Sequence, residues 1–148
     1  MDEDKLWEIR AFVYQHFAET TQPLLVEETA SRFDLTHEQA ASAYKELHQR
    51  HGFFLEPGTH NILMANPFSA VETAFKVYAG GKTYFANCAW DSLGIPAALH
   101  ADAEIQAACA QSGQTIRLTV SRQQVQDSDA LVHFLIPFKN WYNDLTFT

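Results

Sequence analysis

Cys88 and Asp91 are the residues whose types and spacing best suit chemistry in this sequence. The β-prone run Thr83 to Phe85 leads to Asn87, a residue type favoured at helix N-caps. With Asn87 as the cap, Cys88 falls in the first turn of a helix and Asp91 shares its face. The helix dipole favours the thiolate there, whereas the carboxylate opposes ionisation but can accept the thiol proton. The pair predicts a soft nucleophile beside a proton carrier.

The same two residues also have a simpler interpretation. A buried cysteine often acts as a small hydrophobic side chain. An aspartate in the first turn of a helix is common, because it interacts favourably with the dipole. Taken alone, C-x-x-D favours this structural interpretation, since the motif is short.

The residues around the motif help to decide between the reactive and the structural interpretation of Cys88 and Asp91. The run YFANCAWDSLGIPAAL, residues 84–99, resembles the organomercurial (alkylmercury) lyase family, whose members carry a similar aromatic-rich run into C-x-x-D followed by a Leu/Ile-Pro-Ala-Leu segment. The resemblance continues through ACAQSGQTIRLTVS, residues 108–121, to the C-terminus and is weaker before residue 70. The sequence is identified as a member of this family, and catalytic activity is a separate question.

The resemblance implies protonolysis of a carbon–mercury bond. In the family, two cysteines bind the mercury of R–Hg⁺ and an aspartate passes a proton to the departing carbon. By position, Cys88 is the first thiolate and mercury ligand, and Asp91 is the proton carrier. Thiolate suits the soft mercury ion, and its coordination makes the carbon more basic. The implied products are a hydrocarbon and Hg(II), which passes to cellular thiols, and no organic cofactor is needed.

This sequence differs from the family pattern at the second catalytic cysteine. It follows a segment resembling FKNWYNDLTFT, residues 138–148, where this sequence ends. The second domain is therefore expected to be incomplete at its C-terminus, with half of the thiolate pair. Two functions stay open: an organomercurial lyase, or a non-catalytic thiol-dependent metal- or organometal-binding or interaction domain.

Cys109 is the other cysteine of the chain. It matches a family position regarded as structural, and it falls on the apolar face of an expected strand. We expect a buried thiol there, and Cys88 should therefore react with alkylating agents before Cys109. Two cysteines do not make a disulfide framework, although a bond between them is an alternative that the sequence leaves open.

The N-terminal part is expected to form a winged-helix-like domain over residues 1–66. Helical spacing of apolar residues, a capping box formed by Thr36 and Gln39, and a Pro-Gly turn support this arrangement. The expected elements are helices over residues 4–18, 26–33 and 36–51 and strands over residues 53–55 and 62–64.

Residues 67–148 are expected to form an alkylmercury-lyase-like sheet domain. The boundary is placed at Asn66-Pro67, because a residue before proline is disfavoured in helices. The expected strands cover residues 74–78, 83–85, 105–109, 116–120 and 130–136, with a polar loop or short helical turn over residues 121–129. Gly94 and Pro96 are expected to end the C-x-x-D helix. The fold class is α+β: a three-helix unit with a hairpin, then a mostly antiparallel sheet with a short helix carrying the motif.

Charge and composition limit the partners. The formal net charge is -8, and residues 1–66 hold five basic and eleven acidic residues, a balance of -6. This charge argues against DNA or an anionic membrane, although winged-helix domains often bind DNA. No apolar run could span a bilayer, and the start MDEDK lacks the basic region of a signal peptide. We expect a cytoplasmic, reduced protein with a small organomercurial substrate and cellular thiols as Hg(II) acceptors.

Histidines provide a weaker candidate for a metal site. His48 and His51 lie three residues apart on an expected helix and could share a metal with His37 or His60. Exposed histidines on a solvated helix explain the same pattern.

Overall fold

The computed structural model describes residues 1–126 and 128–143. The chain divides into two compact units, Met1–Glu72 and Thr73–Thr148. The helices of the described residues are α1 (Glu3–Thr20), α2 (Val26–Phe33), α3 (His37–Gln49), α4 (Ala89–Leu99) and the 3-10 helix η1 (Phe138–Asn143). The strands are β1 (Phe54–Leu55), β2 (Ile62–Ala65), β3 (Phe68–Ser69), β4 (Phe75–Ala79), β5 (Lys82–Ala86), β6 (Ala103–Ala108), β7 (Thr115–Ser121) and β8 (Gln124–Val125). The predicted α+β class is confirmed.

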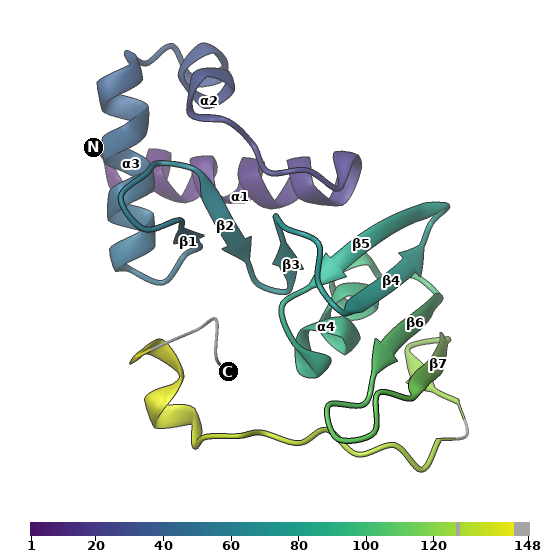
Figure 1. The fold of residues 1–148 in the computed structure, drawn as a ribbon. Helices are drawn as coiled ribbons and strands as arrows, with labels where there is room; N and C mark the ends of the chain where they lie inside the picture. The colour runs from purple at the N-terminus through teal and green to yellow at the C-terminus, as the bar shows by residue number, and fades with distance from the viewer. Residues whose placement is uncertain (127, 144–148) are drawn as a thin grey trace. The chain divides into compact units, whose positions relative to one another are not determined.

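Three helices open the first unit, as predicted (Figure 1). The apolar residues of α1 recur at helical spacing because one face of the helix is buried, and they are Leu6, Ile9, Val13 and Phe17. The predicted capping box begins α3: the N–H of Gln39 donates to Thr36 Oγ1 at 3.2 Å, and the N–H of Thr36 donates to Gln39 Oε1 at 2.8 Å.

A small antiparallel sheet completes this unit. The predicted hairpin is present, with Phe54 opposite Met64. A third strand, β3, was not predicted, and it places Ser69 opposite Met64 on the other edge of β2. Because β3 pairs with β2, the first unit extends to Glu72 rather than ending at Asn66-Pro67. The assignment of a winged-helix-like domain stays a prediction.

Tyr44 carries a buried polar group in the core of this unit. Its hydroxyl donates to the carbonyl oxygen of Leu24 at 3.2 Å and lies 2.8 Å from the hydroxyl of Thr29, which is also buried. Burial raises the pKa of Tyr44 far above its ordinary value. The neutral hydroxyl therefore joins α3 to α2 and to the segment before it.

Replacing Tyr44 with phenylalanine is expected to lower the free energy of unfolding by about 1–3 kcal/mol, because the change leaves Leu24 and Thr29 with an unpaired buried polar group. Urea unfolding followed by circular dichroism measures the loss. The matched control is Tyr78→Phe, since Tyr78 is 41% exposed on β4. Equal losses in the two variants would contradict the role given to the Tyr44 hydroxyl.

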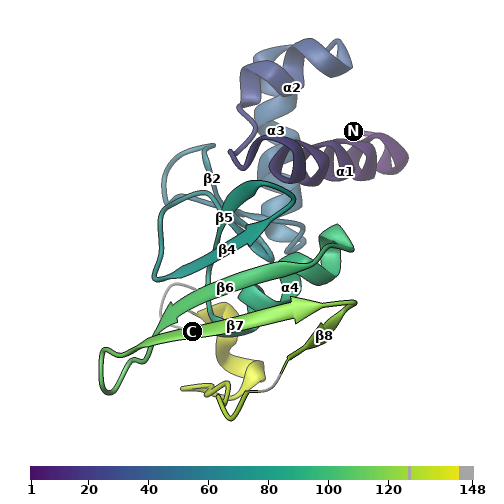
Figure 2. The ribbon, with the colours of Figure 1, turned by 90° about the vertical axis from the view of Figure 1, so that its right-hand side faces the viewer.

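The second unit is built on an antiparallel sheet with the strand order β5-β4-β6-β7-β8 (Figure 2). Val77 at the centre of β4 faces Tyr84 of β5 on one side and Ile105 of β6 on the other. Ile105 in turn faces Leu118 of β7. The mostly antiparallel sheet was predicted, but β8 was not, since residues 121–129 were expected to form a loop or a short helical turn.

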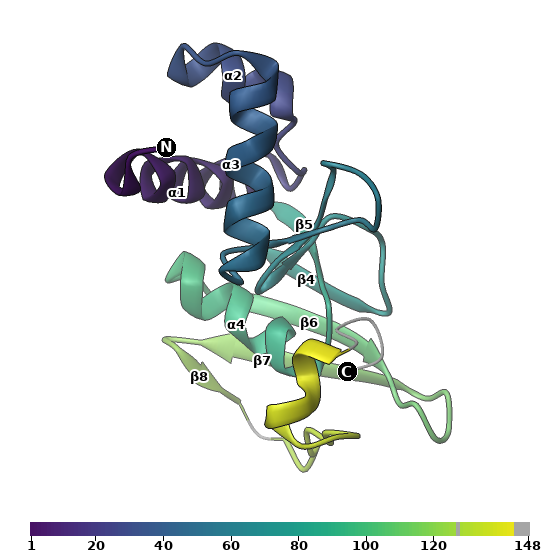
Figure 3. The ribbon, with the colours of Figure 1, turned by 90° about the vertical axis from the view of Figure 1, so that its left-hand side faces the viewer.

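Helix α4 packs against β4, β5 and β6 on one face of this sheet (Figures 2 and 3). The prediction that Gly94 and Pro96 end the helix is wrong, because α4 continues to Leu99. A proline inside a helix removes one backbone hydrogen bond. The side chains of Ile95 and Pro96 are fully buried in this unit, and their burial offsets that loss.

The predicted strand over residues 130–136 is absent. These residues have no regular secondary structure, and η1 follows Pro137. The end of β7 pairs with β8, and the ring of Phe134 packs on Trp90 and Trp141 instead of lying in a strand. Within the described ranges, no helix has the length and apolar character needed to cross a bilayer.

Candidate active site

Cys88 lies where β5 gives way to α4. Its backbone is extended, with φ -151° and ψ 178°, and it is the N-cap of α4. The prediction of Asn87 as the cap is therefore wrong by one residue. The N–H of Asp91 donates to Cys88 Sγ at 3.5 Å, so the sulfur takes the place of the usual cap oxygen.

Asn87 has a different role from the one predicted. Its side-chain Nδ2 donates to Asp91 Oδ2 at 3.2 Å. The Cys88 thiol and the Asp91 carboxylate also lie close enough for each to shift the pKa of the other. One turn thus brings together a thiol, a carboxylate that can take its proton, and an amide that holds the carboxylate. Cys88 and Asp91 share a small patch, as their spacing predicted.

The protonation of Cys88 differs from the prediction. Burial raises the pKa of the thiol, and the negative charge of Asp91 raises it further, although the N–H of Asp91 acts in the opposite direction. The start of the helix favours the thiolate, as predicted, through the N–H groups of Asp91 and Trp90, and the carboxylate opposes it. Burial, which the sequence did not predict, decides the net direction.

The pKa of Asp91 is also raised. Burial is the main cause, and hydrogen bonds from Asn87 and Cys88 partly offset it. The resting pair is therefore a protonated thiol beside a carboxylate that takes up a proton more readily than an exposed one. Such a carboxyl group can accept a proton in one step and return it in the next.

Cys109 occupies the turn between β6 and β7, not a buried sheet face. The register pairs Ala108 with Thr115, which leaves Cys109 beyond the end of β6. Hydrogen bonds from the side chain and backbone of Ser112 lower the pKa of the thiol. The predicted burial of Cys109 is wrong, and both cysteines are free thiols.

We expect iodoacetamide to alkylate Cys109 before Cys88 at neutral pH. The thiolate is the reactive form, and the pKa is lowered at Cys109 but raised at Cys88. This order is the reverse of the one that the sequence suggested. A time course of peptide mapping by mass spectrometry measures the rate of alkylation at each cysteine. The Cys109→Ser variant is the control, because it gives the rate at Cys88 alone. Faster labelling of Cys88 would show that its thiolate is stabilised despite burial.

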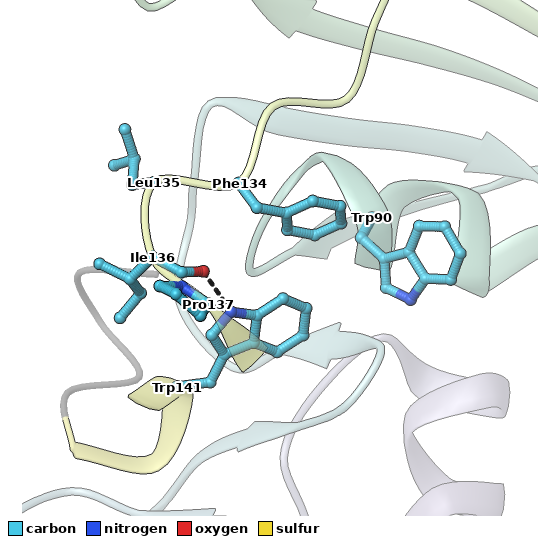
Figure 4. A pocket seen from close by; sticks show the side chains of 6 residues that line it. All are labelled: Trp90, Phe134, Leu135, Ile136, Pro137 and Trp141. Carbon is cyan, nitrogen blue, oxygen red and sulfur yellow. Dashed lines mark hydrogen bonds between the residues drawn. The ribbon is translucent and has the colours of Figure 1, made fainter. Parts of the chain in front are cut away.

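An aromatic pocket lies at the start of α4. Three rings form it: Trp90 of α4, Phe134 of the segment before Pro137, and Trp141 of η1 (Figure 4). The ring centroids of Trp90 and Phe134 are 6.1 Å apart, and Phe134 stacks on Trp141 at 5.1 Å. The cavity has a volume of about 700 Å³, and its other lining residues are Leu135, Ile136 and Pro137. Sequence reasoning missed it, because the apolar segment before Pro137 was assigned to a strand.

The histidine cluster does not form a metal site in the part of the chain that the structure describes. There, no three His, Cys, Asp or Glu side chains are grouped to hold an ion. His48 Nδ1 accepts the N–H of Leu55 at 3.2 Å, and the rings of His48 and His51 pack on Phe54. These two histidines therefore have structural partners.

Comparisons with known proteins identify a family and a similar fold. A family model described as alkylmercury lyase matches residues 68–148. No curated protein matches the chain significantly. A solved structure, described as the mercury-bound form of MerB2, is similar in fold, with a TM-score of 0.67 and 23% sequence identity. The match covers 87% of this chain and 61% of that one, so the chain spans about three-fifths of its length.

Proposed function

The chain belongs to the alkylmercury lyase family, and from this we propose that it captures organomercurials on Cys88 and cleaves their carbon–mercury bond by protonation. The observation that carries the proposal is the hydrogen-bonded pair of Cys88 and Asp91 in the first turn of α4. The pair joins a soft ligand for mercury to a group that can carry one proton.

The first step is capture of the mercurial. The sulfur of Cys88 forms a bond to mercury, and the group that mercury carried, such as chloride, leaves with its electron pair. The thiol proton passes to Asp91. The carboxylate is suited to this transfer because Asp91 is joined to the Cys88 sulfur through its own N–H and its pKa is raised.

The second step is release of the hydrocarbon. Asp91 donates its proton to the carbon bound to mercury, and the electrons of the carbon–mercury bond form the new carbon–hydrogen bond. Asp91 returns to the carboxylate form, and Hg(II) stays on Cys88. A cellular thiol then takes the Hg(II) and the Cys88 thiol is restored. Every proton is accounted for without an organic cofactor.

Binding without cleavage is the second candidate. Capture alone needs only the free thiol of Cys88, which is a soft ligand for mercury. In that case, the chain would be a thiol-dependent organometal-binding module. Both candidates require Cys88, and only the lyase requires Asp91 as an acid.

The test uses a Cys109→Ser background, so that Cys88 is the remaining cysteine. Methylmercury is added with excess small thiol, the adduct is mapped by mass spectrometry, and methane is measured by gas chromatography. We expect one methylmercury on Cys88, followed by methane. A further Cys88→Ser change should abolish both signals. Undiminished binding in that variant would overturn the proposal, and an adduct without methane would identify the binding module.

A further inference from the structure

We propose that Asn87 is a positioning residue for the protonation of carbon: its side-chain amide holds Oδ2 of Asp91 and leaves Oδ1 as the oxygen that carries the proton. This inference rests on the proposed function and adds a residue to it. Asn87 acts through Asp91, so it is neither a mercury ligand nor a proton carrier.

The bond between Asn87 and Asp91 joins the end of a strand to the start of the helix. Asn87 follows β5, which ends at Ala86, and precedes Cys88, the N-cap of α4. Its Nδ2 donates to Asp91 Oδ2 at 3.2 Å, from outside the helix into its first turn. The side chain of Asp91 is therefore held by a part of the chain that does not belong to α4.

The chemistry of the two groups determines which atoms of Asn87 and Asp91 meet. An ionised carboxylate can only accept hydrogen bonds, so the amide has to turn its nitrogen toward Asp91. A hydrogen bond to a charged acceptor is stronger than one between neutral groups. Both residues are half-buried, which limits the competition from water for this bond.

Asp91 is held at two points. Its backbone N–H donates to Cys88 Sγ at 3.5 Å, which keeps the residue beside the sulfur. The bond from Asn87 to Oδ2 restricts the rotation of the carboxyl group. A proton on Oδ2 would face the N–H donor of Asn87, so the thiol proton goes to Oδ1 on capture, and Oδ1 gives it to the carbon on release. A proton held on one oxygen is delivered from one position, and such orientation speeds a reaction.

Loss of the amide should affect release of the hydrocarbon and not capture of the mercurial. Without Asn87, the carboxyl group of Asp91 can turn, and the proton can lie on either oxygen. The acid is then aligned with the carbon in fewer of the bound mercurials. The bond between mercury and Cys88 does not involve the amide and should persist.

The experiment compares Asn87→Leu with its parent in the Cys109→Ser background, since leucine has nearly the shape of asparagine but no donor. The affinity for methylmercury is measured by competition with glutathione, and methane release from the preformed adduct by gas chromatography. We expect the affinity of the parent and a release slower by roughly 10–100-fold, the usual cost of losing a partner that orients a reacting group. Asn61→Leu is the matched control, because Asn61 Nδ2 donates to the Glu56 carboxylate at 3.1 Å in the first unit. It should release methane at the rate of the parent.

A double-mutant cycle tests whether Asn87 acts through Asp91. The Asp91→Asn variant cannot carry the proton, so adding Asn87→Leu to it should slow release no further. A loss as large as in the parent would show that Asn87 acts through another group and would overturn the positioning role.

A further readout does not depend on turnover. In NMR spectra, Asp91→Asn should shift the side-chain N–H resonances of Asn87, because the acceptor loses its charge, and should leave those of Asn61 in place. Unshifted Asn87 resonances would show that the bond does not form in solution, and the positioning role would be wrong.

The outcomes separate this role from the proposed function. If Asn87→Leu releases methane at the rate of the parent, the positioning role is wrong and the proposed function stands. If the affinity falls as much as the release, Asn87 only supports the local structure, and the positioning role is again wrong. If the parent forms the adduct but releases no methane, the lyase function fails and the positioning role fails with it.

Discussion

Replacing Asp91 with asparagine is expected to leave methylmercury bound to Cys88 while methane release falls by roughly 10²–10⁴-fold, the usual contribution of a positioned acid. Asparagine has nearly the same shape as aspartate, and its Oδ1 can still accept the hydrogen bond from Asn87. It cannot take the thiol proton or donate one to carbon. The change therefore removes the chemistry and keeps the local structure.

The comparison needs a matched carboxyl group. Asp102 accepts hydrogen bonds from the Arg122 N–H at 2.8 Å and the Ser121 hydroxyl at 3.2 Å, in the same unit. Asp102→Asn should release methane at the rate of the parent. The adduct on Cys88 is quantified by intact mass and methane by gas chromatography. Undiminished release from Asp91→Asn would show that another group supplies the proton.

Unfolding should not account for the loss of release. Burial raises the pKa of Asp91 in the folded state, so the stability that the neutral carboxyl group contributes is present below its unfolded pKa. That contribution is lost as the pH rises through the folded pKa. At neutral pH a buried charge thus opposes folding, and Asp91→Asn should be at least as stable as the parent.

Periodic burial made much of the fold predictable. The apolar residues of α1 recur at helical spacing, and all four of them are buried. The alternation of Ile116, Leu118 and Val120 likewise predicted β7 and its pairing with β6. Such patterns can be recognised from sequence because each records which side of an element faces the core.

Elements that depend on distant neighbours were not predictable. Pro96 ends a helix by local rules, yet its ring is buried and α4 continues past it. The apolar segment over residues 130–136 has the composition of a strand, but it forms none, and the ring of Phe134 packs on Trp90 and Trp141 instead. In both places, tertiary packing outweighs local preference, and the sequence does not record which neighbours are available.

In the site, too, features set by local spacing were predictable and features set by tertiary packing were not. The spacing of Cys88 and Asp91 predicted their proximity, because spacing along a helix start determines which side chains meet. The direction of the Cys88 pKa shift was missed, since it depends on burial by other parts of the unit. Cys109 was predicted to lie on β6, but the strand ends one residue earlier, at Ala108, so Cys109 lies in the turn. An error of one residue in the end of a strand is enough to change a buried position into a turn position.

Ile95→Ala is expected to lower the free energy of unfolding of the second unit by about 2–5 kcal/mol, the usual cost of truncating a fully buried aliphatic side chain to alanine. Ile95 is completely buried, and α4 packs on β4, β5 and β6. The truncation leaves a cavity where the helix meets the sheet. Because Pro96 already removes one backbone hydrogen bond, α4 depends strongly on this packing.

The measurement follows the second unit alone. In a Trp7→Phe background, the remaining tryptophans, Trp90 and Trp141, both lie in that unit, so urea unfolding followed by fluorescence reports it. The control is Leu131→Ala, since Leu131 is 93% exposed and its loss should change stability by no more than about 0.5 kcal/mol. Equal effects of the two changes would show that Ile95 does not anchor α4. A large effect of Ile95→Ala alone would identify the sheet as the support of the helix turn that carries Cys88 and Asp91.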